Sequence, residues 1–188
     1  MWTEKYRPKN ISEVIGNEEA KIQFIEWLKN WKLGVKPIML YGPPGVGKTT
    51  LVKAVSLDYS YDLIEMNASD ARTEETVVKV AGHASTNVSL FGFISDSKGT
   101  LLLLDEVDGI QGREDKGGVG AVIKIIEQSK IPVVLTANDP SSPKLRDLKA
   151  HCQMIRFYGV RPPVLIAFLE RICGYERITV EPEALEYI

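Results

Sequence analysis

The chain has 188 residues, with 23 Lys and Arg against 25 Asp and Glu, so its formal net charge is −2. Hydrophobic residues make up 44% of it and charged residues 26%, which excludes a disordered, collagen-like or disulfide-dependent protein. The near-neutral charge argues against a nucleic-acid-binding protein, but net charge averages over faces that can differ in sign.

Short apolar runs alternate with helical patterns along the chain. The apolar runs predict buried strands at residues 37–41, 63–66, 101–104, 131–137 and 153–157. The spacing of apolar side chains predicts helices at residues 18–31, 48–59, 73–81 and 119–128. Because uninterrupted apolar strands are typical of sheets buried on both faces, this order predicts an α/β fold with a five-stranded parallel sheet between two layers of helices.

The first long helix, residues 18–31, has a predicted apolar stripe of Ile22, Ile25 and Leu28. Trp27 and Trp31 lie one turn apart on the same helix. They fit either a stacking platform or packing against the core, and packing is the commoner role of aromatic side chains at helical spacing.

The pattern changes after Gly159. Arg161-Pro162-Pro163 opens a helix over residues 164–173, and Gly174 is placed to end it. Glu181-Pro182-Glu183 opens a further helix that reaches Ile188. We therefore expect a core domain over residues 1–161 and the start of an incomplete, all-helical domain over residues 162–188.

Nothing in the sequence indicates a membrane or a secreted protein. The first residues contain no apolar signal-peptide core, and the apolar runs are far shorter than the roughly 18 residues of a membrane helix. Cys152 and Cys173 have no CxxC motif or His/Cys cluster beside them. Two reduced thiols in an intracellular protein are therefore expected, and a zinc site is not.

A glycine-rich loop carries the strongest functional signal, because it matches the phosphate-binding pattern G-x-x-x-x-G-K-[ST]. It follows a predicted strand and opens a predicted helix, so its backbone N–H groups and the helix dipole would face phosphates. Lys48 would approach the β- and γ-phosphates, and the Thr49 hydroxyl would bind Mg²⁺. The residues expected around the nucleotide phosphates are Gly42, Pro43, Pro44, Gly45, Val46, Gly47, Lys48, Thr49 and Thr50.

Four leucines followed by two carboxylates form the second signal. Asp105, at the end of the strand 101–104, can hold the magnesium shell. Glu106 is placed to polarise an attacking water, which favours hydrolysis over transfer to another acceptor. An acidic loop after a strand is the alternative, although a phosphate-binding loop upstream weakens it. Asn138 follows the fourth strand, where it would face the γ-phosphate and orient water, but Asn138-Asp139-Pro140 alone reads as a turn.

These motifs, in this order and on these strands, resemble the AAA+ ATPases, a group of P-loop NTPases. The opening Trp2-Thr3-Glu4-Lys5-Tyr6-Arg7-Pro8, the downstream Val14-Ile15-Gly16 and Asn67-Ala68-Ser69-Asp70 resemble the replication factor C clamp loaders. The resemblance covers nearly the whole chain. It implies an AAA+ core that binds ATP and Mg²⁺, followed by a helical lid domain that starts at residue 162.

The resemblance also implies roles outside the two strongest motifs. Arg7, Pro8, Ile15 and Gly16 would flank the nucleotide base. Asn67 would act as a switch that restrains Glu106 until DNA is bound.

One departure from the family pattern is informative. Small subunits of these loaders carry a Ser-Arg-Cys motif before the last core strand, and its arginine reaches the neighbour's ATP. This chain has Ala150-His151-Cys152 there, and a neutral imidazole offers neither a permanent charge nor a bidentate fork. The chain would then receive an arginine finger from a neighbour, as the archaeal-type large subunits do. A surface histidine without a role is the alternative.

By the same resemblance, basic residues at helix N-termini contact duplex phosphates without reading sequence. The matching positions are Arg72, Arg113 and Lys116, with Glu114 and Asp115 diluting their charge. Residues 144–161 hold five bases and one acid, a net +4, and residues 162–188 hold two bases and five acids, a net −3. A basic core face and an acidic lid segment therefore underlie the overall −2.

We therefore expect a clamp-loader ATPase of the large-subunit type, which uses ATP to open a ring-shaped DNA polymerase clamp and load it onto primer-template DNA. The expected partners are the loader's small subunits, the sliding clamp and DNA, with no membrane. The expected location is the cytoplasm near the nucleoid in an archaeon and the nucleus in a eukaryote. Two alternatives are open: another AAA+ DNA motor, for Holliday-junction branch migration or replication restart, and a loader subunit that binds ATP without hydrolysing it.

Overall fold

A parallel sheet forms the centre of the computed structural model, which describes residues 1–68, 97–110, 116–139 and 141–185. Its five strands are arranged in the order β2-β3-β4-β1-β5, and all neighbours are parallel. The strands are β1 (Ile38–Tyr41), β2 (Tyr61–Asn67), β3 (Gly99–Asp105), β4 (Val133–Ala137) and β5 (Gln153–Arg156). Every predicted apolar run forms one strand, so the predicted five-stranded parallel sheet is confirmed.

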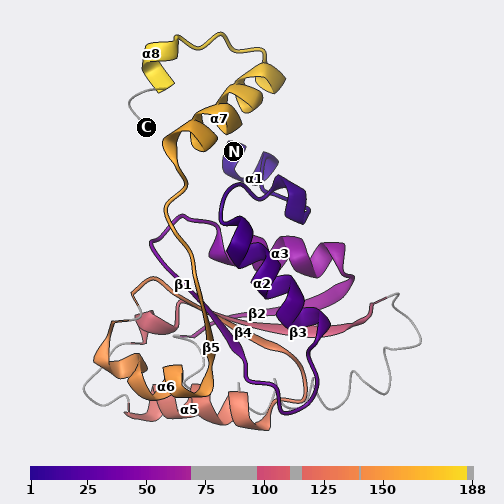
Figure 1. Ribbon diagram of the computed structural model, residues 1–188, viewed down its shortest axis with the longest axis vertical. Coiled ribbons are helices and arrows are strands. Elements are labelled where there is room, and N and C mark those ends of the chain that lie inside the picture. The colour runs from indigo at the N-terminus through magenta and orange to yellow at the C-terminus, as the bar shows by residue number, and fades with distance from the viewer. Residues whose placement is uncertain (69–96, 111–115, 140, 186–188) are drawn as a thin grey trace.

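Helices cover both faces of the sheet. Figure 1 shows α2 and α3 over one face of the sheet and α5 and α6 over the other. In the same view α7 and α8 lie at the top of the molecule, near the N-terminal segment. The helices of the described residues are α1 (Trp2–Lys5), α2 (Glu18–Lys29), α3 (Lys48–Asp58), α5 (Lys116–Gln128), α6 (Arg146–His151), α7 (Pro162–Glu176) and α8 (Pro182–Leu185). Short 3₁₀ turns are η1 (Ile11–Glu13), η2 (Val107–Gly109) and η3 (Pro143–Leu145). The predicted helix 73–81 lies outside the described residues.

The leucines of β3 alternate between two cores, because successive side chains of a strand point to opposite faces. Leu102 and Leu104 pack into the core that includes residues of α5 and α6. Leu101 and Leu103 pack into the core that includes residues of α2 and α3. All four are fully buried, and each contributes about 1.5–3 kcal/mol by leaving water. This one strand therefore holds both helix layers onto the sheet.

The predicted apolar stripe of α2 is confirmed at Leu28, which is buried, and at Ile25, which packs against the core, and it is wrong at Ile22. Ile22 is 57% exposed, whereas Phe24 and Trp27 are buried and stack with ring centroids 5.9 Å apart. Lys21 is also buried, because its Nζ donates a hydrogen bond of 2.7 Å to the carbonyl O of Val14. Phe24 and Trp27, and not Ile22, thus complete the buried face of α2, and Trp27 belongs to the core.

Two helical features near the C-terminal side also differ from expectation. α7 continues past Gly174 and is capped by Arg177, which adopts a left-handed conformation with φ of 56°. The backbone N–H of Arg177 donates to the carbonyl O of Gly174 at 3.2 Å. α6 has only six residues, too few for a periodic pattern to reveal it.

Strand register decides which residues meet at the carboxyl edge of the sheet. Leu104 pairs with Leu135, and Tyr41 pairs with Ala137. The residues that follow β1, β3 and β4 therefore lie next to one another, although the sequence separates them widely. The backbone N–H of Gly42 continues this pairing by donating to the carbonyl O of Ala137 at 3.2 Å.

Candidate functional site

The glycine-rich loop joins β1 to α3 in conformations that suit glycine. Gly45 and Gly47 have φ angles of 75° and 93°, in the left-handed region. A Cβ on Gly42 would lie 2.2 Å from the carbonyl O of Phe157, just after β5. The loop thus runs too close to the neighbouring chain for a side chain at this position. Its place at the N-terminus of α3 is suited to binding phosphate.

Lys48 is buried in the first turn of α3. Its Nζ donates to the carbonyl oxygens of Gly42 and Pro43, both at 2.8 Å, and to Oδ1 of Asn138 at 2.9 Å. Burial lowers the pKa of Lys48 below its ordinary value, and three nearby carboxylates oppose that shift. These carboxylates belong to Asp108, Asp105 and Glu106. A cation held beside the loop by neutral acceptors can exchange them for phosphate oxygens.

Oxygen ligands for a divalent cation meet beside the loop. Thr49 Oγ1 donates a hydrogen bond of 2.9 Å to Oδ1 of Asp105, and Thr136 Oγ1 also donates to this carboxylate. The described residues contain no group of three or more His, Cys, Asp and Glu side chains that could hold a metal. Mg²⁺ is commonly bound by one or two carboxylates together with substrate phosphates and water, so Thr49 and Asp105 fit it.

Glu106 follows β3 with an unusual backbone. Its φ of 56° and ψ of 50° place it in the left-handed region, which is rare for a residue with a long side chain. Its backbone N–H donates to Oγ1 of Thr136 at 3.0 Å. Asn67 Nδ2 lies 3.5 Å from Oε2 of Glu106, a long hydrogen bond. The main chain of Glu106 is therefore fixed, while its exposed carboxylate remains accessible beside Asn67.

Sequence analysis missed two residues that connect these parts. Thr136 is 1% exposed, donates to Asp105 and accepts from the backbone N–H of Glu106. Asp108 Oδ2 accepts the backbone N–H groups of residues 138 and 139, each at 3.1 Å. Both residues stand next to predicted motifs, but only the strand register reveals what they contact.

The residues expected at the nucleotide base are only partly brought together. Val14 lies against the glycine-rich loop, since a Cβ on Gly47 would be 3.9 Å from Val14 Cγ1. Ile15 and Gly16 line one hollow together with Val164 of α7. Arg7 lines another hollow with Phe168 and Ile172 of α7, and Pro8, half-buried, follows it. Three of the four expected residues are thus divided between two hollows that α7 borders, and Pro8 lines neither of these hollows.

The same segment is tied to the chain that leads into α7. Asn17 Nδ2 donates to the carbonyl O of Tyr158 at 3.0 Å, and Asn17 Oδ1 accepts the backbone N–H of Tyr158 at 2.8 Å. A Cβ on Gly16 would lie 3.4 Å from Val160 Cγ2. The segment around residues 14–17 therefore contacts both the glycine-rich loop and the start of the C-terminal helices.

Lys5 and Tyr6 make a second connection, from the N-terminal segment to α7 itself. Both donate to Oε1 of Glu176 at 2.7 Å. The rings of Tyr6 and Tyr175 stack with centroids 6.3 Å apart and planes 8° apart. The hydrogen bonds from Lys5 and Tyr6 lower the pKa of Glu176.

His151, which the sequence resemblance placed at the arginine-finger position, ends α6. β5 starts two residues later and runs parallel to β1, so His151 lies at the sheet edge opposite the glycine-rich loop. Its side chain is 38% exposed, and Nδ1 is 3.8 Å from Oε1 of Glu127. His151 is thus remote from this chain's own phosphate-binding loop.

Of the three residues expected to contact DNA, only one lies within the described residues. Arg72 and Arg113 lie outside the described residues, and Lys116 is the first residue of α5.

Among the described helices, none has the length and apolar character to cross a bilayer. Both cysteines are free thiols, Cys152 buried and Cys173 half-buried.

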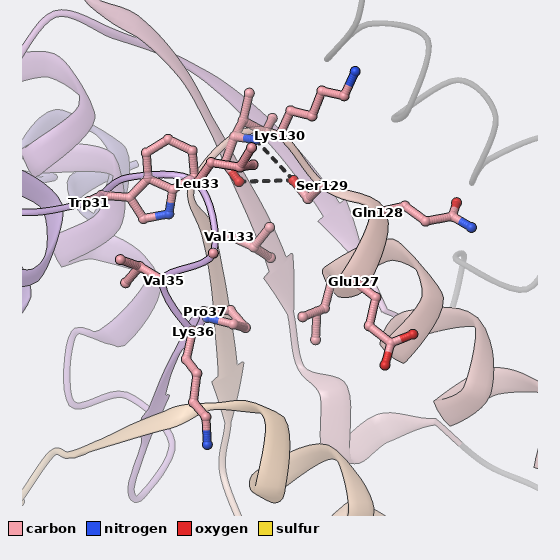
Figure 2. Close-up of a pocket in the computed structure, with 13 residues that line it drawn as sticks. Trp31, Leu33, Val35, Lys36, Pro37, Glu127, Gln128, Ser129, Lys130 and Val133 are labelled. Atoms are coloured by element: carbon pink, nitrogen blue, oxygen red, sulfur yellow. Dashed lines mark hydrogen bonds between the residues drawn. The ribbon is translucent and has the colours of Figure 1, made fainter.

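A separate hollow of about 470 Å³ lies at the amino ends of β1 and β4 (Figure 2). Trp31 and Val35 line it from the segment before β1, and Glu127 from the end of α5. Lys36 and Lys130 add positive charge to its wall. The hollow is remote from the loop of residues 42–49, because it borders the opposite ends of the same strands.

The family of this chain follows from its sequence as well as its fold. The profile of the family described as "ATPase family associated with various cellular activities (AAA)" matches residues 38–158. The chain belongs to this family, and its parallel sheet with a loop after β1 is the P-loop NTPase fold.

Over its whole length the chain is similar to archaeal proteins named "Replication factor C large subunit". It is 45% identical over 190 residues to that of Thermofilum pendens, aligning all of this chain with 45% of the relative. It is 45% identical over 191 residues to that of Sulfurisphaera tokodaii, aligning all of this chain with 42% of the relative. The chain therefore spans less than half the length of these curated relatives.

A solved structure described as a "crystal structure of DNA replication initiation factor" shares the fold. It matches with a TM-score of 0.63, covering 96% of this chain and 58% of that chain. At 18% sequence identity, this likeness supports the fold alone.

Proposed function

We propose that this chain is the ATP-binding and ATP-hydrolysing part of a clamp-loader large subunit. Such a subunit uses ATP to open a ring-shaped DNA polymerase clamp and place it on primer-template DNA. The observation that carries the proposal is the 45% identity to archaeal replication factor C large subunits over the full chain. The meeting of Lys48, Asp105 and Glu106 at one edge of the sheet supports the ATPase part.

In this proposal the chain's own residues bind ATP and activate water. The backbone N–H groups of residues 42–49 and the ammonium of Lys48 bind the phosphates. Glu106 accepts a proton from the attacking water, and Asn138 orients that water. Thr50 adds to the phosphate site, while Arg7 and Gly16 flank the base. Asn67, within 3.5 Å of Glu106, restrains its carboxylate until DNA is bound.

Thr49 and Asp105 are the residues that would hold Mg²⁺. When bound there, Mg²⁺ neutralises phosphate charge in the transition state. The hydrogen bond of 2.9 Å between their side chains keeps the two oxygens together, and Thr136 orients the carboxylate.

The site is completed by partner subunits in this proposal. His151 lies at the far edge of the sheet and carries no permanent positive charge, so the chain receives an arginine finger and does not supply one. Residues 1–161 form the ATPase core, and residues 162–188 begin the helical lid. Arg72, Arg113 and Lys116 contact DNA phosphates without reading sequence.

The test is steady-state ATP hydrolysis by the full-length protein assembled with small subunits, clamp and primed DNA. The small subunits carry Gln at their own catalytic glutamates, so that the remaining turnover belongs to this chain. We expect turnover to rise when clamp and DNA are added. Glu106→Gln should lower kcat about a hundredfold or more while ATP stays bound, and Lys48→Ala should weaken ATP binding or abolish turnover.

Glu127→Gln is the matched control, because this exposed carboxylate lies at the far edge of the sheet. It should keep full turnover. No response to clamp and DNA would contradict the loader function. Unchanged turnover in Glu106→Gln would instead favour a subunit that binds ATP without hydrolysing it.

A further inference from the structure

The turn after β3 contains a carboxylate that the proposed mechanism does not use. Asp108 lies in η2, three residues beyond Asp105. Its Oδ2 accepts two hydrogen bonds, from the backbone N–H groups of Asn138 and Asp139, both at 3.1 Å. These bonds join the turns that follow two neighbouring strands.

The two bonds hold the main chain that carries Asn138. β4 ends at Ala137, so the N–H groups of residues 138 and 139 lie beyond the sheet's hydrogen bonds and need other acceptors. Asp108 supplies one oxygen to both. The side chain of Asn138 then accepts the hydrogen bond from Lys48 Nζ at 2.9 Å. The turn from Glu106 to Asp108 is thereby connected to the phosphate-binding lysine.

The other oxygen of Asp108, Oδ1, shows that this side chain carries an energetic cost. Oδ1 is buried and has no hydrogen-bond partner among the described residues, which is unfavourable for a carboxylate. A costly side chain that bridges two catalytic turns indicates a functional role.

We propose that Asp108 is a positioning residue. It holds the main chain of residues 138 and 139, and so keeps the side chain of Asn138 in place relative to Lys48 and Glu106. This inference rests on the proposed ATPase function. Asp108 acts through the hydrogen bonds that Oδ2 accepts from the backbone of residues 138 and 139.

Three variants of the full-length protein distinguish the effect of the hydrogen bonds to Asp108 from the effect of its negative charge. Asp108→Asn removes the charge and keeps an oxygen that can accept both hydrogen bonds, whereas Asp108→Ala removes both. Asp139→Ala is the control on the same turn. Within the described part of the chain its exposed side chain accepts hydrogen bonds only from Ser141, and the substitution leaves Asp108 in place. All are assembled with the Gln-substituted small subunits, clamp and DNA.

We expect Asp108→Ala to lower kcat by about tenfold to a hundredfold without weakening ATP binding, because a displaced Asn138 no longer orients water. Asp108→Asn should keep most of the turnover, and Asp139→Ala all of it. ATP affinity is measured separately, by titration with a fluorescent analogue.

Hydrogen exchange provides a readout that needs no hydrolysis. Mass spectrometry of a peptide covering residues 133–140, which excludes the Ser141 N–H that donates to Asp139, should show faster amide exchange in Asp108→Ala than in the wild type, with Asp108→Asn and Asp139→Ala unchanged. A wild-type complex that hydrolyses no ATP would overturn the proposed function, and this exchange result would still decide the positioning role.

Three outcomes would overturn the role of Asp108. Wild-type exchange in Asp108→Ala would show that its hydrogen bonds do not hold the turn. An equal loss of kcat in the Asn and Ala variants would assign the effect to charge. A parallel loss of ATP binding and kcat would indicate that the whole site had collapsed.

Discussion

A single buried hydroxyl, that of Thr136, connects the carboxyl end of β4 to the carboxyl end of β3 through hydrogen bonds. It donates to the carboxylate of Asp105 and accepts the backbone N–H of Glu106. A hydroxyl can do both, whereas a methyl group of the same size can do neither. Thr136 therefore fixes the carboxylate that we propose binds Mg²⁺ and the strained main chain of Glu106 together.

Thr136→Val should lower the free energy of unfolding by about 1–3 kcal/mol, because it leaves the N–H of Glu106 without its acceptor. Thr136→Ser keeps the hydroxyl and should stay near the wild type. Urea denaturation followed by circular dichroism measures both. Equal stability of the Val variant and the wild type would show that water replaces the lost acceptor.

At the scale of residues, prediction succeeded where the signal is local in sequence. The loop of residues 42–49 is one continuous motif, and the structure places it between a strand and a helix as expected. Thr136 and Asp108 could not be found in this way. Their partners lie about thirty residues away, and only the pairing of Leu104 with Leu135 brings them together.

At the scale of elements, the sequence predicted which segments form strands and which form helices. It predicted less well which face of a helix is buried and where a helix ends. The strands stand out because both of their faces are apolar. The face of α2 was predicted only in part. Leu28 is buried as expected, but periodicity counts Lys21 as exposed, whereas a carbonyl oxygen and the carboxylate of Glu18 accept its hydrogen bonds. The end of α7 was misjudged because Gly174 is the more usual helix stop, yet Arg177 takes the left-handed conformation.

The contact between the N-terminal segment and α7 should depend on pH. Hydrogen bonds from Lys5 and then Tyr6 lower the pKa of Glu176 from its ordinary value of 4.5. A lowered pKa means that the contact is fully favoured above pH 4.5 and is lost as the pH falls through the lowered value. The near-ultraviolet circular dichroism of the stacked Tyr6 and Tyr175 should therefore fade in acid.

Glu176→Gln should reduce this tyrosine signal at neutral pH and remove its acid transition. Glu170→Gln is the control, since it replaces an exposed carboxylate of the same helix. An acid transition that persists in Glu176→Gln would assign the pH dependence to another group.

For the whole molecule, the charge of −2 hides an uneven distribution. Residues 144–161 carry a net +4 and residues 162–188 a net −3. A protein that meets DNA through a few phosphate contacts within a ring of subunits need not be basic overall. The fold class was predictable from the sequence, whereas the strand order depends on contacts between distant segments.

Arg72→Ala and Arg113→Ala should each lower the DNA affinity of the assembled complex. Each should also flatten the slope of log K against log salt by about one unit, because one phosphate contact is lost. Lys130→Ala serves as the control, since this exposed lysine borders the hollow at the amino ends of β1 and β4. Fluorescence anisotropy with primed DNA at several salt concentrations measures the slopes. Slopes equal to the wild type would mean that these arginines do not touch phosphate.

The strand order also bears on how the protein is made. β1 pairs with β4 and β5, both of which the ribosome synthesises long after it. During translation β1 and its loop are left without neighbouring strands, whereas β2 and β3 can already pair with each other. We therefore expect the loop to bind nucleotide only after β4 and β5 have been synthesised and have paired with β1. Newly made chains therefore gain no stability from cellular ATP until the core is almost complete.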